Sequence, residues 1–96
     1  MPQSSRHLAA IMFTDIVGYT ALMDKDEDAA FEMLEKNRAI HNEIIKKYRG
    51  KFLKEMGDGI LASFQTVTDA IYSAGYIQRA CENEVHLNLR IGIHQG

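Results

Sequence analysis

The chain has 96 residues, a formal net charge of −2, 46% hydrophobic and 25% charged residues, the composition of one small globular domain. This charge excludes a basic surface for a nucleic-acid backbone, and no apolar run is long enough to span a bilayer. The single cysteine, Cys81, excludes an intrachain disulfide and favours a reducing, cytoplasmic compartment.

The first expected element is a buried strand that ends at a carboxylate. Residues 1–7 are polar and predict a loose lead-in, so the folded part is expected to span 8–96. The continuous apolar run Leu8–Phe13 is typical of a strand that is buried on both faces. We expect this strand to end at Asp15, and ligand sites collect at such strand ends in α/β folds.

A glycine turn and a short helix are expected next. The helix would run from Gly18 to Met23. The main-chain N–H groups of Gly18, Tyr19 and Thr20 would point outward at its start, where phosphate oxygens bind. A carboxylate beside such a loop suggests a metal–nucleotide site, and this site needs a second carboxylate.

A longer helix follows, with charges that match its dipole. Acidic residues gather at its start, within Asp24–Asp28, and basic residues gather at its end, within Lys46–Arg49. Gly50 is expected to be the left-handed residue that closes the helix. The residues expected on its apolar face are Ala30, Leu34, Arg38, His41, Ile45 and Tyr48.

A β-hairpin is predicted to supply the second carboxylate. The apolar-rich strands Lys51–Met56 and Gly59–Gln65 flank the motif Met56-Gly57-Asp58-Gly59. An Asp-Gly step between two such runs is typical of a hairpin turn, so Asp58 is expected to project from its tip.

A third helix and a last strand complete the chain. The helix would begin at a cap on Thr66 or Thr68 and run to about Asn83, with Gly75 allowing close packing on the sheet. Its expected small-residue face is Ala70, Ala74, Ile77 and Cys81. The last strand alternates, with Leu87, Leu89, Ile91 and Ile93 on one face.

The order strand–helix–strand–strand–helix–strand predicts an α+β, ferredoxin-like βα(α)ββαβ sandwich with an antiparallel four-stranded sheet and helices on one face. In this topology the first and third strands are adjacent, so Asp15 and Asp58 are expected to be neighbours. Two such carboxylates can hold a pair of Mg²⁺ ions roughly 3.5–4 Å apart. The other face of the sheet is expected to meet a second chain or a further segment.

Three motifs carry a resemblance to a known family. They are Phe13-Thr14-Asp15-Ile16-Val17-Gly18-Tyr19-Thr20, Lys54-Glu55-Met56-Gly57-Asp58-Gly59 and Arg90-Ile91-Gly92-Ile93-His94-Gln95-Gly96. Together, and in this order, they resemble the N-terminal portion of the class III adenylate/guanylate cyclase catalytic domain, and the match covers nearly the whole chain.

The resemblance implies a two-metal phosphorus–oxygen lyase that uses two Mg²⁺ or Mn²⁺ ions. In the family, the metals are held by aspartates that match Asp15 and Asp58, and by the main-chain carbonyl at the position of Ile16. The loop at Gly18–Thr20 matches the part that contacts the phosphates. Lys54 matches a base-reading position, where lysine resembles the adenylate cyclases, so ATP is the expected substrate and cyclic AMP the expected product.

The resemblance covers only the first part of the family domain. Later segments of the family carry an asparagine that orients the ribose, an arginine that stabilises the transition state and a second base-reading residue, which act across a head-to-tail dimer. The resemblance therefore implies a homodimer with a role in cyclic-nucleotide signalling, and the 96-residue chain is expected to be weak or inactive alone.

Other readings of the same residues stay open. The chain could be a non-catalytic metal/nucleotide-binding or dimerisation module derived from a cyclase, or a ferredoxin-like regulatory domain. Asp15 and Asp58 could be ordinary turn residues, and Lys54 a solvated strand residue. The four histidines show no metal-ligand spacing and are expected at the surface or partly packed. Met12, Met33 and Met56 are expected to fill the core.

Overall fold

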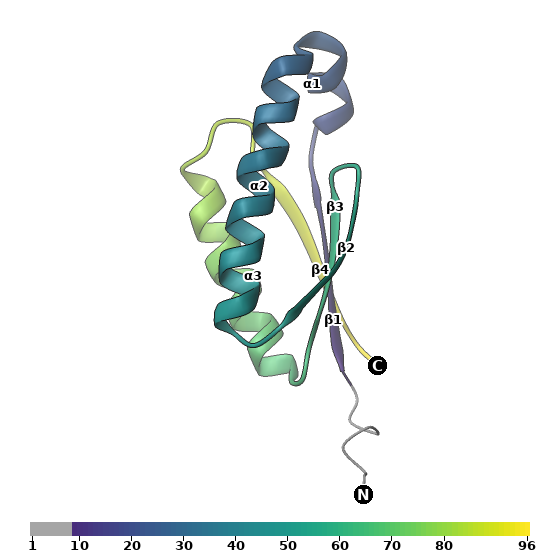
Figure 1. Cartoon of the computed structure of the whole chain (residues 1–96), viewed down its shortest axis with the longest axis vertical. Helices are drawn as coiled ribbons and strands as arrows, with labels where there is room; N and C mark the ends of the chain where they lie inside the picture. The colour runs from purple at the N-terminus through teal and green to yellow at the C-terminus, as the bar shows by residue number, and fades with distance from the viewer. Residues whose placement is uncertain (1–8) are drawn as a thin grey trace, which may run out of the picture.

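The computed structural model describes residues 9–96 and has the predicted α+β fold (Figure 1). The predicted lead-in 1–7 and Leu8 lie outside the described residues. The elements in chain order are β1 (Ala10–Ile16), α1 (Tyr19–Lys25), α2 (Glu27–Lys47), β2 (Lys51–Met56), β3 (Gly59–Phe64), α3 (Val67–Glu82) and β4 (Leu89–Gln95). The four strands form one antiparallel sheet in the order β2-β3-β1-β4. The first and third strands are therefore neighbours, as the chain order predicts.

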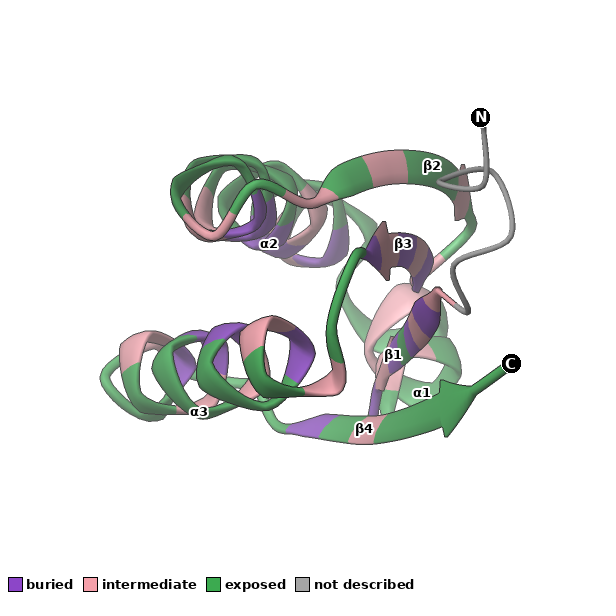
Figure 2. Cartoon of the chain, turned by 90° about the horizontal axis from the view of Figure 1, so that it is seen from below, coloured by how far each residue is buried: buried purple, intermediate pink, exposed green. Residues whose placement is uncertain are grey.

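The helices α2 and α3 lie on one face of this sheet, and no helix of residues 9–96 covers the other face, called here the open face (Figure 2). Alternate residues of β1 (Ala10, Met12, Thr14 and Ile16) are buried, and the apolar ones join the core cluster with residues of α2 and α3. Phe13, which points the other way, is 40% exposed. The expectation that the first strand is buried on both faces is thus not met within the described residues. None of their helices combines the length and apolar character that a bilayer crossing requires.

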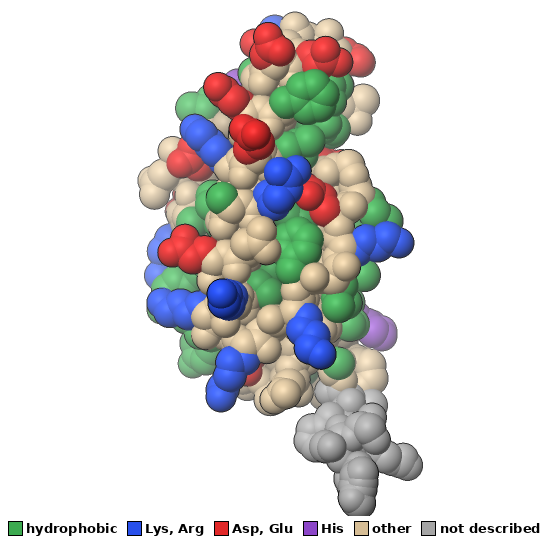
Figure 3. Space-filling model, in the orientation of Figure 1, with side chains coloured by type: hydrophobic (Ala, Val, Ile, Leu, Met, Phe, Trp, Pro, Cys, Tyr) green, Lys and Arg blue, Asp and Glu red, His purple; other side chains and the backbone are tan. Residues whose placement is uncertain are grey.

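Helix α2 begins and ends at the predicted charged clusters. Asp26 is its N-cap and accepts a hydrogen bond from Ala29 N at 3.1 Å, with acidic residues in the first turn and lysines in the last. Figure 3 shows the acidic side chains grouped toward the end where α1 and α2 meet and basic ones toward the opposite end.

The buried row of α2 differs from the predicted one. Its buried residues are Ala30, Met33, Asn37, His41 and Ile45. Leu34 is only half-buried, and Arg38 turns to the flank, where its Nε donates to Glu55 Oε1 of β2 at 2.7 Å. This ion pair satisfies the guanidinium outside the core, so Met33 and Asn37 take the places that the pattern assigned to Leu34 and Arg38.

The prediction that Gly50 is the left-handed residue was wrong, because Arg49 takes that conformation, with φ 62°. Arg49 N donates to Lys46 O and Gly50 N donates to Ile45 O at 2.8 Å, which is a Schellman closure with arginine at its left-handed position. Gly50 serves a different need. A Cβ at this position would lie 2.4 Å from the ring of the buried Phe64.

Thr66 is the N-cap of helix α3, and its side chain accepts a hydrogen bond from Asp69 N at 3.0 Å. Its buried residues are Ala70, Ser73, Ile77 and Cys81. Burial raises the pKa of the Cys81 thiol to about 11, as suits an inert packed cysteine. The expected packing role of Gly75 was wrong, because Gly75 is exposed and a Cβ there would meet no atom within 4 Å.

The predictions for Leu87 and Met56, which lie near the ends of strands, need correction. Strand β4 begins at Leu89, so Leu87 is buried just ahead of the strand rather than within it. Met12 and Met33 are core residues as predicted, but Met56 is 49% exposed at the end of the edge strand β2.

A buried polar chain links β1 to α2. The expectation that the histidines lie at the surface or are only partly packed fails for His41, which is fully buried. His41 Nδ1 donates to the carbonyl of Asn37 at 2.8 Å, so Nε2 accepts from the Thr14 hydroxyl, also at 2.8 Å. Both ring nitrogens are satisfied in the neutral form.

This arrangement predicts that the stability of the fold falls with pH below about 6.5, the ordinary pKa of histidine. Burial lowers the pKa of His41 in the folded chain. At pH values between the lowered pKa and about 6.5, His41 binds a proton in the unfolded chain but not in the folded chain. The contribution to stability is therefore complete above about pH 6.5 and declines as the pH falls through this range. Urea midpoints from pH 7.5 to 5.5 measure the slope. His41→Gln should flatten it, whereas substitution of the exposed His94 by Gln should leave it; equal slopes in all three proteins would contradict the prediction.

Candidate metal–nucleotide site

The tip of the β2–β3 hairpin is joined to the end of β1. Asp58 Oδ2 accepts a hydrogen bond from Ile16 N at 2.9 Å. Two features bring them together: Gly57 takes the positive φ of 57° that the tight turn requires, and the β1–β3 register pairs Thr14 with Ile60. Asp58 therefore lies beside the main chain of the residue that follows Asp15.

The carboxylate of Asp15 is engaged by a residue that sequence reasoning missed. Arg90 of β4 lies directly opposite Asp15, and its Nε and Nη2 donate to Asp15 Oδ1 and Oδ2 at 2.9 and 3.3 Å. The hydrogen bond and charge of Asp15 raise the pKa of Arg90, and the charge of Asp58 adds to this. The guanidinium thus feels both carboxylates. The alternation of the last strand placed Arg90 on its polar face, but only the β1–β4 register sets it opposite Asp15.

The predicted phosphate loop lies directly after this carboxylate. Gly18 has a φ of 81° and precedes α1, and no side chain caps the helix. Val17 N donates to Asn88 O at 2.7 Å, which ties the loop to the segment before β4. Tyr19 and Thr20 form the first turn of α1, where N–H groups have no carbonyl within the helix to bond. These N–H groups are the ones that the sequence assigned to phosphate oxygens.

Lys54 lies on the open face of the sheet. It pairs with Leu61 of β3, which pairs in turn with Phe13 of β1, and residues directly opposite in antiparallel strands project to the same side. Asp15 is two residues beyond Phe13 and so shares this face. The register therefore places Lys54, Asp15 and Arg90 on one surface, at the end of the sheet that carries the hairpin tip.

The donor set suits a hard divalent cation. Asp15 and Asp58 offer carboxylate oxygens next to the main chain of Ile16, and Mg²⁺ is bound through one or two carboxylates completed by waters and substrate phosphates. Residues 9–96 contain no group of three or more His, Cys, Asp or Glu side chains placed to hold a metal. A metal here would need the carbonyl of Ile16 and oxygens from outside the protein.

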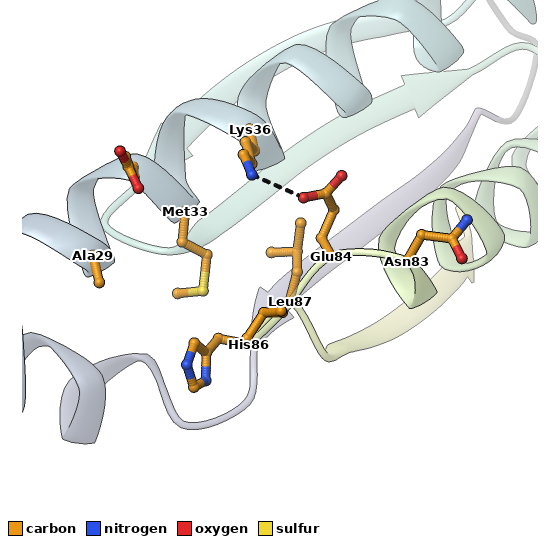
Figure 4. Close-up of a pocket in the computed structure, with 9 residues that line it drawn as sticks. Ala29, Met33, Lys36, Asn83, Glu84, His86 and Leu87 are labelled. Atoms are coloured by element: carbon orange, nitrogen blue, oxygen red, sulfur yellow. Dashed lines mark hydrogen bonds and ion pairs between the residues drawn. The ribbon is translucent and has the colours of Figure 1, made fainter.

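A separate hollow lies away from these candidate residues. A cavity of about 200 Å³ opens between α2 and the segment that joins α3 to β4, on the helix side of the molecule (Figure 4). Lys36 Nζ donates to Glu84 Oε1 across it at 3.0 Å, with Met33 and Leu87 in its wall. None of the candidate site residues lines it.

Comparisons with known proteins show the family of the chain. The whole chain, residues 1–96, matches the sequence model of the adenylate and guanylate cyclase catalytic domain. A Rhizobium meliloti (strain 1021) protein described as "Putative adenylate cyclase 3" is 29% identical over 99 residues, which cover 95% of this chain and 17% of that protein.

Solved structures give the same result for the fold. A bacterial light-regulated adenylyl cyclase superposes with a TM-score of 0.85 at 26% identity, over 93% of this chain and 53% of that one. A Trypanosoma brucei adenylate cyclase, solved in its monomeric state, superposes over the full chain with a TM-score of 0.88 at 18% identity, which covers 59% of that protein. The chain spans a little over half the length of these two structures.

The antiparallel α+β fold of this chain is shared with the cyclase catalytic domains that superpose on it. The chain belongs to the adenylate and guanylate cyclase catalytic domain family.

Proposed function

We propose that this chain forms the metal-binding half of an adenylate cyclase site, which in the complete domain converts ATP to cyclic AMP and pyrophosphate. The observation that carries the proposal is the hydrogen bond from Ile16 N to Asp58 Oδ2, because it holds the Asp58 carboxylate against the main chain of the residue that follows Asp15. Supporting it are the family match over residues 1–96 and the adenylate cyclases among the relatives.

Different residues of the chain would bind the metal ions and the phosphates. Asp15, Asp58 and the carbonyl of Ile16 would hold two Mg²⁺ or Mn²⁺ ions. When bound, these ions polarise the α-phosphate and lower the pKa of the ribose 3′-hydroxyl. The N–H groups of Gly18–Thr20 would orient the phosphates, and fixed donors of this kind stabilise charge without reorganising.

Lys54 would select the purine base. Its ammonium can donate to adenine N1 but cannot satisfy the N1–H of guanine, which is itself a donor. Because Lys54 shares the open face with Asp15, a nucleotide lying across this face could meet both. We further propose that the complete domain acts in the cytoplasm as a homodimer whose partner covers the open face.

Nucleotide binding tests the proposal without requiring turnover. Calorimetry with Mn–ATP and Mn–GTP should show that the chain binds ATP more tightly than GTP. Lys54→Glu should reduce this preference roughly three- to tenfold, the net worth of one typical hydrogen bond. Lys51→Glu makes the same charge change at the far end of β2 and should keep the preference. The absence of Mn²⁺-dependent nucleotide binding would overturn the proposal.

A binding-only module is the second candidate, because this chain spans 53% and 59% of the two solved cyclases. Mass-spectrometric detection of cyclic AMP from ATP and Mn²⁺ separates the two candidates. Product that disappears in Asp15→Ala would show catalysis by the chain itself. Nucleotide binding without product would favour the binding module.

A further inference from the structure

Arg90 holds Asp15 in the way that a bound cation would. The guanidinium places Nε 2.9 Å from Oδ1 and Nη2 3.3 Å from Oδ2, so each carboxylate oxygen accepts one N–H. A fork of this kind offers positive charge and directed donors together. The lone pairs that it occupies include those that a metal ion would need.

The same contact is easily released. The side chain of Arg90 is 72% exposed, whereas that of Asp15 is 22% exposed, so the arginine can swing into water while the aspartate stays on the sheet. Ion pairs at such exposed sites are weak. Arginine does not lose its proton in proteins, so the pair opens only when the side chain moves.

Arg90 also reduces the electrostatic repulsion between the two carboxylates of the site. Asp58 is held near Asp15 by its bond to Ile16 N, and two neighbouring carboxylates repel one another when no cation is present. The hydrogen bond and charge of Asp15, and to a smaller extent the charge of Asp58, raise the pKa of Arg90. Its position on β4, directly opposite Asp15, is set by the strand register rather than by a loop.

We infer that Arg90 is a positioning residue that stands in for the metal at Asp15, and that it must leave this carboxylate before a divalent ion can bind. The inference rests on the proposed metal role of Asp15. It predicts a competition: the arginine keeps the carboxylate orientated and neutralised, and lowers the affinity of the free site for metal.

Manganese binding measures this competition directly. Electron paramagnetic resonance counts free Mn²⁺ in titrations without nucleotide, and Arg90→Gln should bind Mn²⁺ roughly two- to fivefold more tightly than the unmodified chain. Lys51→Gln removes an equal charge from the same face at its other end and should change the affinity far less. An unchanged affinity in Arg90→Gln, or an equal gain in both variants, would overturn the inference.

Nuclear magnetic resonance of arginine Nε–H groups gives a readout that a purely structural role would not move. The Arg90 signal, assigned by its loss in Arg90→Lys, should shift to the position of a free arginine as diamagnetic Mg²⁺ is added. Asp15→Asn should produce that shift without any metal. A signal that stays at its hydrogen-bonded position at saturating Mg²⁺ would contradict the displacement.

The metal role of Asp15 and the competition by Arg90 can be refuted separately. If Asp15→Asn loses Mn²⁺ binding while Arg90→Gln behaves like the unmodified chain, the metal site stands and the competition is refuted. If Asp15→Asn binds Mn²⁺ as well as the unmodified chain does, the metal role of Asp15 fails, and the inference fails with it.

Discussion

Asp58→Asn should lower the affinity of the chain for Mn²⁺ at least about tenfold and leave its fold nearly as stable as before. The amide oxygen of asparagine can still accept the hydrogen bond from Ile16 N, now 2.9 Å long, so the hairpin tip stays anchored. The charge that attracts the cation is lost, and the number of charged ligands is a main determinant of affinity at oxygen sites. Manganese titration and urea unfolding of the same samples separate the two effects.

Two further variants make this test sharper. Asp58→Ala removes both the charge and the acceptor, so it should lose Mn²⁺ binding and also about 1–3 kcal/mol of stability, since Ile16 N is left without its partner. Asp24→Asn removes an acidic charge from the exposed end of α1 and should change neither quantity. Binding of Mn²⁺ by Asp58→Asn at the level of the unmodified chain would show that Asp58 is only a turn residue.

Gly50→Ala should destabilise the fold by about 1–3 kcal/mol, the usual cost of overpacking. The added Cβ would lie 2.4 Å from one ring carbon of Phe64 and 2.7 and 2.9 Å from two others. Phe64 is 2% exposed and belongs to the core cluster, so its ring has no free space to enter. For a chain of this size, each kcal/mol lowers the melting temperature by about 4–8 °C, which calorimetry resolves readily.

Gly75→Ala makes the same chemical change with the opposite expected sign. Gly75 lies inside α3, and its Cβ would meet nothing within 4 Å, so alanine should stabilise the helix by up to about 1 kcal/mol. A melting temperature that falls in both variants, or in neither, would mean that the contact with Phe64 is not what makes Gly50 necessary.

The topology and the position of the carboxylates could be predicted because they follow from local patterns and chain order. Apolar runs, an Asp-Gly turn and the charged ends of the long helix marked the elements. The antiparallel pairing of β1 with β3 then brought Asp58 beside the end of β1. The position of Asp58 therefore depends on the pairing of only two strands, β1 and β3.

What escaped prediction depends on contacts between elements distant in the chain. The partnership of Arg90 with Asp15 joins residues 75 positions apart and requires the register of a second strand pair. Helical spacing alone placed Arg38 on the apolar face of α2, because nothing local reveals its ion pair with Glu55. His41 was placed on the same face but was expected to be at most partly packed, because its full burial depends on Thr14 of β1 supplying the second hydrogen bond.

The two edges of the sheet are protected unequally, and this bears on how self-association of the chain is interpreted. β2 carries Lys51 and Lys54 and a register shift between Phe52 and Lys54, features that discourage pairing with a foreign strand. β4 presents the run Ile91-Gly92-Ile93, and its charged residue Arg90 is engaged with Asp15. Chains at high concentration are therefore expected to join edge to edge through β4. An increase in molecular mass alone would report this strand pairing as readily as a dimer formed across the open face.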